Sequence, residues 1–278
     1  MFTINAALQE ATASIGRVDA QAILTHVLGV DRAYLAAHPI QVLTETQDAR
    51  IDAMVAQRTM GFPVAYVIGK REFYSREFEV NSDVLIPRPE TETLVEHALP
   101  LLRHSREGGS PASALDLGTG SGIVAVTLAC EMPKVSMTAT DSSRAALAIA
   151  RANAKAHKAK VEFLEGEWYA PVEGRRFDLI VSNPPYVAGG DPHLAQGDLR
   201  FEPRHALTDG SGDGLDSIRH IVAGARGHLN PGGAILIEHG YDQAQAVAAL
   251  LGKAGFADLV AIKDLAGIPR VAGGRLGP

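Results

Sequence analysis

Apolar positions in the first 60 residues recur three and four apart, which is the spacing of one buried face on an α-helix. The pattern is clear in three stretches, residues 4–15, 19–30 and 44–60. Four residues suit helix ends: Asp19 and Thr44 as N-caps, Gly29 and Gly61 as stops. The pattern therefore predicts a small helical domain over residues 1–62.

From residue 63 the pattern changes. In AYVIGKREFYSREFEV, aromatic and β-branched residues surround a polar Ser-Arg turn, which predicts a β-hairpin that bridges two domains over residues 63–88. An extended segment bounded by prolines then leads into an amphipathic helix that starts near Glu90. Residues 103–113 are polar and lack periodicity, which predicts a mobile connection.

Beyond this connection, short apolar runs alternate with helical patterns. We expect strands at residues 114–117, 135–140, 161–166, 177–181, 233–239, 258–265 and 270–276. We expect helices at residues 122–130, 143–156, 214–229 and 242–255. Such alternation predicts an α/β domain over residues 89–278, with a doubly wound, mostly parallel sheet of seven strands whose last two close as a hairpin. Ligands of such sheets bind at the carboxyl ends of the strands.

Composition narrows the class of protein. The chain has 278 residues, 46% of them hydrophobic, which is enough to bury a core in one or two domains. It has no basic-then-apolar leader and no apolar run of about 18 residues, so we expect a cytoplasmic protein that does not contact a membrane. A net charge of −6 argues against a partner recognised through its phosphates. The single cysteine, Cys130, and ten scattered histidines predict no disulfide and no metal site.

A glycine-rich turn follows the first strand of this domain. In ALDLGTGSG, Asp116 is followed by Gly118, Thr119, Gly120, Ser121 and Gly122, directly before a predicted helix. Glycines let the backbone approach a ligand closely, and the helix N-terminus offers free N–H groups. A tight strand-to-helix turn would explain the glycines equally simply, so the motif alone does not identify a ligand.

Two further residues favour a nucleoside ligand. Asp141 ends the second strand, where a carboxylate can accept hydrogen bonds from both ribose hydroxyls, although it could simply cap the next helix. Trp168 follows the third strand, where its ring could cover an adenine or belong to the core. Because Asp116 suits a cationic amino-acid group, and a dinucleotide would more typically follow G-x-G-x-x-G, these residues favour S-adenosyl-L-methionine.

The loop VSNPPYV follows the fourth strand. Prolines cannot extend a sheet ladder, so Pro184 and Pro185 form a rigid loop whose carbonyls stay free. The Asn183 side-chain oxygen and the Pro184 carbonyl can accept the two hydrogens of a planar amide or amino nitrogen and turn it toward a methyl donor. Tyr186 can pack on the planar group. An ordinary rigid turn is the alternative interpretation.

Together, DLGTGSG, VSNPPYV, IPRPETE and FEPRHAL resemble the PrmC/HemK family of protein-(glutamine-N5) methyltransferases over nearly the whole chain. The resemblance implies a Rossmann-like methyltransferase sheet with a helical N-terminal domain that helps to hold the substrate. It also implies methyl transfer to the glutamine of the Gly-Gly-Gln motif in class 1 peptide chain release factors, with S-adenosyl-L-homocysteine as the product. No direct nucleic-acid substrate is then expected.

The resemblance carries further residues over to the site. Arg88, Pro89 and Glu90 match the family's PRPE segment near the substrate, although Pro89 and Glu90 also suit a helix start. FEPRHAL, residues 201–207, could shape the substrate opening or be a structural loop. Two other functions stay open: an N-methyltransferase that acts on DNA adenine or rRNA guanine, which can share the NPPY loop, and a non-catalytic binding module with the same fold.

Overall fold

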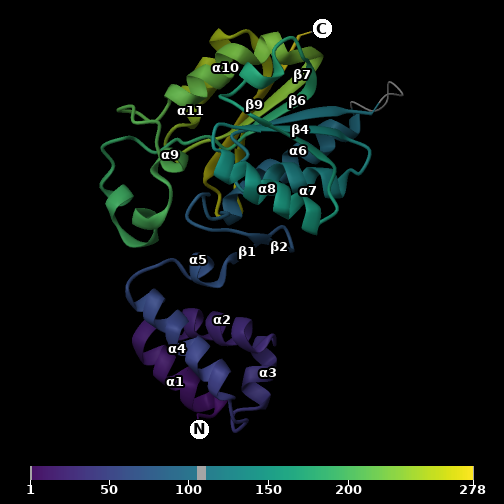
Figure 1. The fold of residues 1–278 in the computed structure, drawn as a ribbon. Coiled ribbons are helices and arrows are strands. Elements are labelled where there is room, and N and C mark those ends of the chain that lie inside the picture. The colour runs from purple at the N-terminus through teal and green to yellow at the C-terminus, as the bar shows by residue number, and fades with distance from the viewer. Residues whose placement is uncertain (1, 105–110, 278) are drawn as a thin grey trace. The chain divides into compact units, whose positions relative to one another are not determined.

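The computed structural model describes residues 2–104 and 111–277, which form two compact units (Figure 1). One unit comprises the chain up to Lys70 together with Ala195–Phe201. The other comprises Arg71–Leu194 and the chain from Glu202 onward. The mobile connection predicted over 103–113 falls largely on residues 105–110, which lie outside the described residues. The domain boundaries at 62 and 88 stay predictions.

The helical unit contains the three helices that the periodicity predicts. Its helices are α1 (Ile4–Ile15), α2 (Arg17–Leu28), α3 (Arg32–Ala37), α4 (Glu45–Thr59) and α5 (Val64–Ile68). Thr44 caps α4 in a capping box with Gln47, and Gly29 ends α2 in the left-handed conformation, as expected. The prediction that Asp19 is an N-cap is wrong. The cap of α2 is Gly16, and the Asp19 carboxylate instead pairs with Arg58 at 2.6 Å.

The segment Ala195–Phe201 belongs to the helical unit although it lies far along the chain. Arg58 also pairs with Asp198 at 2.9 Å, and the rings of Phe62 and Phe201 lie 4.7 Å apart. One arginine of α4 thus holds two carboxylates, one from α2 and one from this distant segment.

The predicted hairpin is present but shorter than expected. Strands β1 (Lys70–Phe73) and β2 (Arg76–Glu79) pair across a two-residue turn in which Tyr74 and Ser75 have positive φ, as hairpin turns require. The preceding residues, predicted as part of the first strand, form helix α5 instead. Ala65 is buried and Val64, Val67 and Ile68 pack on the helical core, so packing overrides the β preference of these side chains.

The second unit is built on a seven-stranded sheet in the order β5-β4-β3-β6-β7-β9-β8. The strands are β3 (Ser113–Leu117), β4 (Ser136–Asp141), β5 (Val161–Glu165), β6 (Phe177–Ser182), β7 (Leu229–Glu238), β8 (Phe256–Lys263) and β9 (Pro269–Leu276). Strands β3 to β7 pair in parallel, and β9 is antiparallel to both of its neighbours. The predicted α/β class, mostly parallel order and closing hairpin are confirmed.

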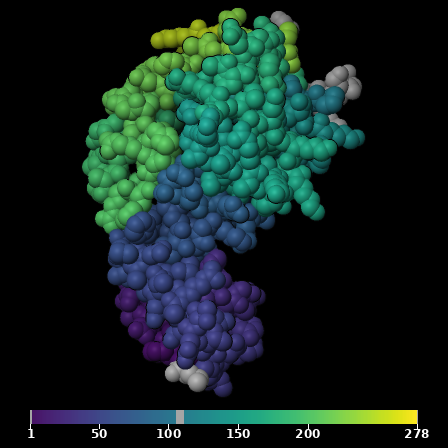
Figure 2. Space-filling view, viewed as in Figure 1, coloured from purple at the N-terminus to yellow at the C-terminus, as the bar shows by residue number. Residues whose placement is uncertain are grey.

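Helices cover both faces of this sheet. They are α6 (Glu92–His104), α7 (Ile123–Glu131), α8 (Arg144–Ala156), α10 (Asp216–His228) and α11 (Ala244–Lys253), with a short α9 (Arg204–Leu207). Short 3₁₀ turns span Pro89–Thr91, Ala170–Val172 and Pro192–Ala195, and a further one, Gly197–Phe201, lies in the segment that belongs to the helical unit. In Figure 2 the teal chain around α7 and α8 forms much of the visible surface of this unit. No helix in the part of the chain that the structure describes is long and apolar enough to cross a membrane.

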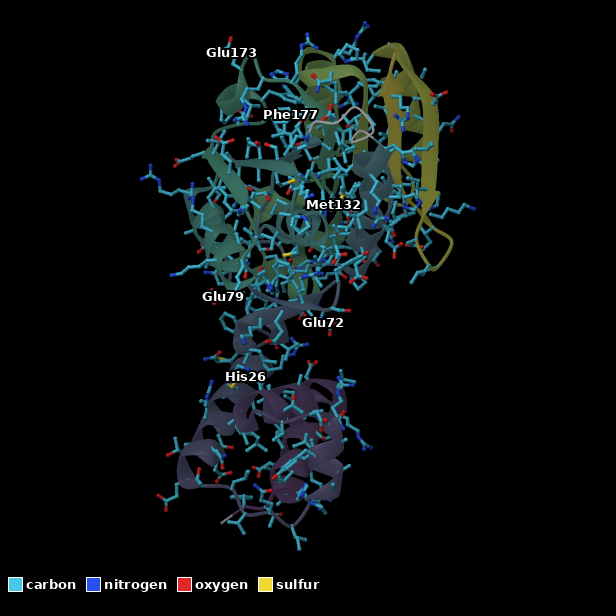
Figure 3. The ribbon with its side chains drawn as sticks, turned by 90° about the vertical axis from the view of Figure 1, so that its right-hand side faces the viewer. His26, Glu72, Glu79, Met132, Glu173 and Phe177 are labelled. Carbon is cyan, nitrogen blue, oxygen red and sulfur yellow. The ribbon has the colours of Figure 1, made fainter. Side chains whose placement is uncertain are left out.

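Alternate residues of β6 belong to different hydrophobic clusters, because successive side chains of a strand face opposite sides. Leu179 and Val181 pack with residues of α6 and α7, whereas Ile180 packs with residues of α10 and α11. Met132 and Phe177 lie inside the unit and Glu173 lies at its surface (Figure 3). The central strands are thus buried on both faces, and only their ends are available for a ligand.

Candidate active site

The glycine turn after β3 has a shape that few other residues would allow. Gly118, Gly120 and Gly122 all have positive φ, at 70°, 55° and 82°. The N–H groups of Gly118 and Thr119 both donate to the carbonyl of Thr140 at the end of β4. Gly122 then begins α7 as its N-cap residue. The turn is therefore fixed to the neighbouring strand and leads directly into a helix N-terminus.

A cleft opens over this turn within the second unit, at the carboxyl ends of β3, β4 and β6. The predicted site residues that line it are Arg88, Gly118, Thr119, Gly120, Ser121, Asp141, Trp168, Asn183 and Pro185. The predicted site residues that do not line it are Gly122, Pro184, Tyr186 and Glu90. The glycine turn, Asp141, Trp168 and two residues of the NPPY loop thus line one cleft.

Asp116 lies at the base of this cleft and is 1% exposed. Its Oδ2 accepts a hydrogen bond from the Thr119 hydroxyl at 2.7 Å. Burial raises the pKa of Asp116 to about 7, against the lowering effect of hydrogen bonds from Thr119 and the Ala125 backbone. A buried carboxyl of this kind would gain from a cationic partner in the cleft.

Asp141 performs a second task besides facing the cleft. Its Oδ2 accepts the Gly120 N–H at 2.8 Å, and its Oδ1 accepts the Ser143 N–H at 2.8 Å. The carboxylate therefore holds the glycine turn in shape and still has lone pairs for ribose hydroxyls. The cap of α8 is Ser143, so Asp141 supports the cap and does not replace it.

Trp168 stands opposite the glycine turn. Its backbone has a positive φ of 45°, and its carbonyl accepts a hydrogen bond from the Thr140 hydroxyl at 3.0 Å. A carbon atom added at Gly118 would lie 3.6 Å from the indole ring, so the ring and the turn are neighbours. The ring packs against the core, as one interpretation expects, and it also lines the cleft, so its role in covering an adenine stays a prediction.

The NPPY loop begins where β6 ends, one strand away from the glycine turn. Ser182 pairs in register with Leu117 of β3, and its hydroxyl donates to the Leu117 carbonyl at 2.7 Å. Asn183 follows directly and is partly exposed in the cleft. Its Nδ2 donates to the hydroxyl of Thr91 at 3.2 Å. The pairing of β3 with β6 therefore places the Asn183 amide beside the expected cofactor turn.

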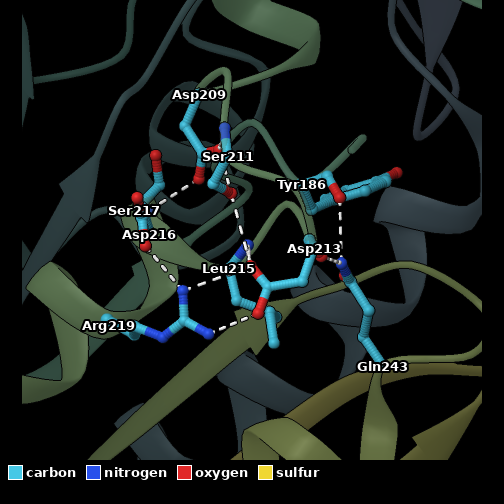
Figure 4. Close-up of polar contacts among 9 residues, drawn as sticks. All are labelled: Tyr186, Asp209, Ser211, Asp213, Leu215, Asp216, Ser217, Arg219 and Gln243. Atoms are coloured by element: carbon cyan, nitrogen blue, oxygen red, sulfur yellow. Dashed lines mark hydrogen bonds and ion pairs between the residues drawn. The ribbon is translucent and has the colours of Figure 1, made fainter. Parts of the chain in front are cut away.

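Tyr186, at the other end of the loop, is turned away from the cleft. Its ring packs against the core cluster shared with α10 and α11, and its hydroxyl donates to Glu238 Oε1 at 3.2 Å. Burial raises the pKa of Tyr186. Gln243 donates to the Tyr186 carbonyl at 3.0 Å and to the Asp213 carbonyl at 2.8 Å (Figure 4). In this structure Tyr186 anchors the loop.

The segment after the NPPY loop returns to support it. The N–H of Val187 donates to the Leu207 carbonyl, and that of Gly189 donates to the Ser211 carbonyl. Gly214 approaches the loop so closely that an added carbon atom would lie 2.2 Å from the Tyr186 carbonyl oxygen. Asp209 and Asp213 accept hydrogen bonds from nearby backbone and serine groups, and Arg219 pairs with Asp213 and Asp216 (Figure 4).

Arg88 lines the cleft and pairs with Glu202, whose side chain is fully buried. The same carboxylate accepts the Ile86 N–H at 3.0 Å, which ties FEPRHAL to the segment before PRPE. His205 and Ala206 of FEPRHAL also line the cleft, whereas Glu90 is half-buried outside it.

Sequence reasoning missed several residues of the site. Those that line the cleft are Asp83, Val84, Leu85, Pro87, Ile123, Val124, Ser142, Ala146, Gly166 and Glu167. Their position next to matched motifs was an available signal for most of them. Thr91 and Glu238 were missed too, because their contacts with the NPPY loop join residues 92 and 52 positions apart. No group of residues suited to a metal ion occurs within residues 2–104 and 111–277.

The comparisons with known proteins now decide the family. The chain is 52% identical over 271 residues, 97% of each chain, to a "Release factor glutamine methyltransferase" of Xylella fastidiosa. It is 50% identical over 261 residues, 94% of this chain and 95% of the relative, to the protein of that name from Bordetella pertussis. This chain belongs to the release factor glutamine methyltransferase family.

Two family regions match separate parts of the chain. Residues 3–69 match the PrmC N-terminal domain, and residues 98–210 match the methyltransferase small domain. A methyltransferase from Pyrococcus furiosus shares the fold at 20% identity, with a TM-score of 0.56 over 84% of this chain and all of that chain. The resemblance to the glutamine methyltransferase family is confirmed, and with it the methyltransferase fold.

Proposed function

We propose that this release factor glutamine methyltransferase transfers a methyl group from S-adenosyl-L-methionine to the side-chain amide nitrogen (N5) of the Gly-Gly-Gln glutamine in class 1 peptide chain release factors. The observation that carries the proposal is the match over 97% of the chain to a relative of that name. The reaction leaves S-adenosyl-L-homocysteine. We propose the cytoplasm, where translation terminates, as its location.

The residues of the cleft fit this cofactor. Asp141 offers carboxylate oxygens for ribose hydroxyls, and the Trp168 ring offers a flat apolar surface for an adenine. The buried Asp116 carboxyl is suited to the ammonium of the methionine part, which would favour its ionised form. When bound, S-adenosyl-L-methionine supplies an electrophilic methyl group on a sulfonium. We assign cofactor binding to these three residues, to Gly118, Thr119, Gly120, Ser121 and Gly122, and to Asn183, which lines the same cleft.

The NPPY loop provides the acceptors for the substrate amide. Asn183 Oδ1 and the Pro184 carbonyl can accept the two N–H hydrogens of a glutamine side chain. Holding both hydrogens turns the nitrogen lone pair toward the methyl group and favours loss of planarity as the nitrogen attacks. Pro185 stiffens the loop, and Tyr186 anchors it through Glu238. This is catalysis by positioning and electrostatics, with no strong base required.

Two further assignments complete the proposal. The helical domain over residues 1–62 would contribute to holding the release factor. Arg88 and Glu90 would lie beside the substrate segment, with Arg88 kept in place by Glu202. The net charge of −6 does not favour binding of a nucleic-acid substrate.

The direct test incubates the protein with S-adenosyl-L-methionine and a release factor, followed by mass spectrometry of the Gly-Gly-Gln peptide. We expect a mass increase of one methyl group on the glutamine. Parallel reactions with a Gly-Gly-Asn release-factor variant and with rRNA should give no product. An unmodified glutamine at saturating cofactor, or methylated RNA, would contradict the proposal.

A further inference from the structure

Thr91 is a hydrogen-bond partner of Asn183, and a role for it rests on the acceptor role proposed above for Asn183. Thr91 lies in the turn Pro89–Thr91 just before α6 and is 0% exposed. Its hydroxyl accepts a hydrogen bond from Asn183 Nδ2 at 3.2 Å. No described residue donates to Asn183 Oδ1, so this oxygen is available for a ligand in the cleft.

An asparagine amide has two ends of similar shape and opposite chemistry. The nitrogen end only donates hydrogen bonds, and the oxygen end only accepts them. Only the orientation with Nδ2 toward Thr91 leaves an acceptor for a substrate N–H. A hydroxyl can hold either end, because it can both donate and accept. Thr91 therefore needs a second partner that removes this ambiguity.

Glu238 is that partner. It ends β7, is 0% exposed, accepts a hydrogen bond from the Tyr186 hydroxyl at 3.2 Å, and lies near the Thr91 side chain, which helps to lower its pKa against the effect of burial. Burial raises the pKa of Glu238 to about 7, so above this pH the carboxylate is ionised and only accepts hydrogen bonds. A Thr91 hydrogen directed to it then leaves only the Thr91 lone pairs for Asn183. Glu238 Oε2 has no hydrogen-bond partner among the described residues, so this buried carboxylate can accept a further donor such as the Thr91 hydroxyl.

We propose that Thr91, oriented by Glu238, is a positioning residue that sets which end of the Asn183 amide faces the substrate. The chain of contacts runs from the end of β7, through the turn before α6, to the residue that follows β6. The same carboxylate also holds Tyr186, so one buried group acts on both ends of the NPPY loop. The site is then specific for a nitrogen with hydrogens to donate.

Two substitutions at position 91 separate this role from simple packing. Thr91→Val keeps the shape of the side chain and removes the hydroxyl, whereas Thr91→Ser keeps the hydroxyl and removes a buried methyl group. A packing role predicts that serine is the more harmful change, because it leaves a cavity. The proposed positioning role predicts the reverse, namely that Thr91→Val lowers kcat more than Thr91→Ser does. Thr93→Val, at another buried threonine of the same region, is the matched control.

The experiment measures kcat and KM for methylation of the intact release factor. For Thr91→Val we expect kcat to fall about 10- to 100-fold, the loss typical of a misplaced catalytic group. We expect KM values for cofactor and release factor to change little, Thr91→Ser to recover most of the rate, and Thr93→Val to behave as wild type. In an Asn183→Ala background, adding Thr91→Val should cause no further loss.

The outcomes are distinct from those of the proposed function. If the wild-type protein does not methylate the glutamine, the proposed function fails. If it does, and Thr91→Val retains full kcat, raises only KM, or is less impaired than Thr91→Ser, the positioning role is wrong.

Discussion

At the scale of single residues, Asn183 and Asp141 each combine an observed structural contact with a proposed role in the cleft. Asn183 Nδ2 binds Thr91, and the two Asp141 oxygens hold the backbone of Gly120 and Ser143. Substitutions at these positions therefore affect different steps of the reaction.

Asn183→Ala should lower kcat about 100-fold or more, because one of the two fixed acceptors for the substrate amide is lost. The side chain is partly exposed, so folding and cofactor affinity should change little. Single-turnover kinetics with calorimetric titration of S-adenosyl-L-methionine would check both parts. A near-normal rate would remove Asn183 from the acceptor role.

Asp141→Ala should instead weaken cofactor affinity about 10-fold or more, because it removes charged acceptors and also releases the Gly120 N–H that shapes the turn. Asp141→Asn keeps one carbonyl oxygen, so its cofactor affinity should lie between those of the wild type and of Asp141→Ala. Calorimetric titration gives both affinities. Equal affinity for wild type and Asp141→Ala would show that this carboxylate does not serve the cofactor.

The sequence predicts residues of this kind only when a motif carries them. The glycine turn, Asp141, Trp168 and Asn183 lie in recognisable positions after strands, and the structure brings them to one cleft. Glu238 lies in no quoted motif, and Thr91 lies within IPRPETE without a residue-level signal, since each contacts a side chain distant in the sequence. The Asp19 prediction failed because a carboxylate in a first helical turn can pair with a distant arginine instead of capping.

At the scale of elements, Asn153 joins the hairpin to the glycine turn. This buried residue of α8 accepts the Glu79 N–H at 2.7 Å and donates to the carbonyls of Glu79 and Ser121 at 3.0 and 2.9 Å. The edge of β2 is thereby satisfied by a side chain in place of another strand.

Asn153→Ala should lower the free energy of unfolding by about 1–3 kcal/mol, because it leaves three backbone groups without their partner. Lys155→Ala, at an exposed position of the same helix, should leave the free energy of unfolding nearly unchanged. Urea unfolding followed by circular dichroism would compare them. Equal stability of the two variants would show that water replaces these hydrogen bonds without loss.

Element types follow from local patterns more reliably than their boundaries do. The βα alternation predicted the sheet correctly, because apolar positions repeat with different periods in buried strands and in amphipathic helices. Helix α5 was mistaken for strand, because four of its five residues are β-branched or aromatic and their local pattern does not reveal the helical core on which they pack. The contacts of Ala195–Phe201 with the helical unit could not be predicted, because they depend on a distant arginine and phenylalanine.

At the scale of the whole molecule, two buried carboxyl groups affect how stability depends on pH. Burial raises the pKa of Asp116 and that of Glu238 to about 7, from about 4 in an unfolded chain. Between these values the folded protein holds protons that the unfolded chain has lost. Each group therefore makes the protein less stable as pH rises from about 4 to 7, with no further change above that.

Replacing Glu238 by glutamine removes one of these titrations. Relative to wild type, Glu238→Gln should gain stability as pH rises from 5 to 8, by up to about 1.4 kcal/mol per pH unit. The comparison cancels His239, whose pKa burial lowers and whose effect on stability has the opposite sign. Urea unfolding at several pH values gives the difference. A constant difference across this range would show that Glu238 does not titrate there.

The protein also contains an intrinsic fluorescent probe. Trp168 is the only tryptophan in the chain, and its indole lines the cleft beside the glycine turn. Its emission depends on its immediate surroundings, so an adenine stacked on the ring would quench or shift the fluorescence of the whole protein. Cofactor exchange between catalytic cycles could thus be followed in real time on the unmodified enzyme, at a wavelength that tyrosine does not absorb.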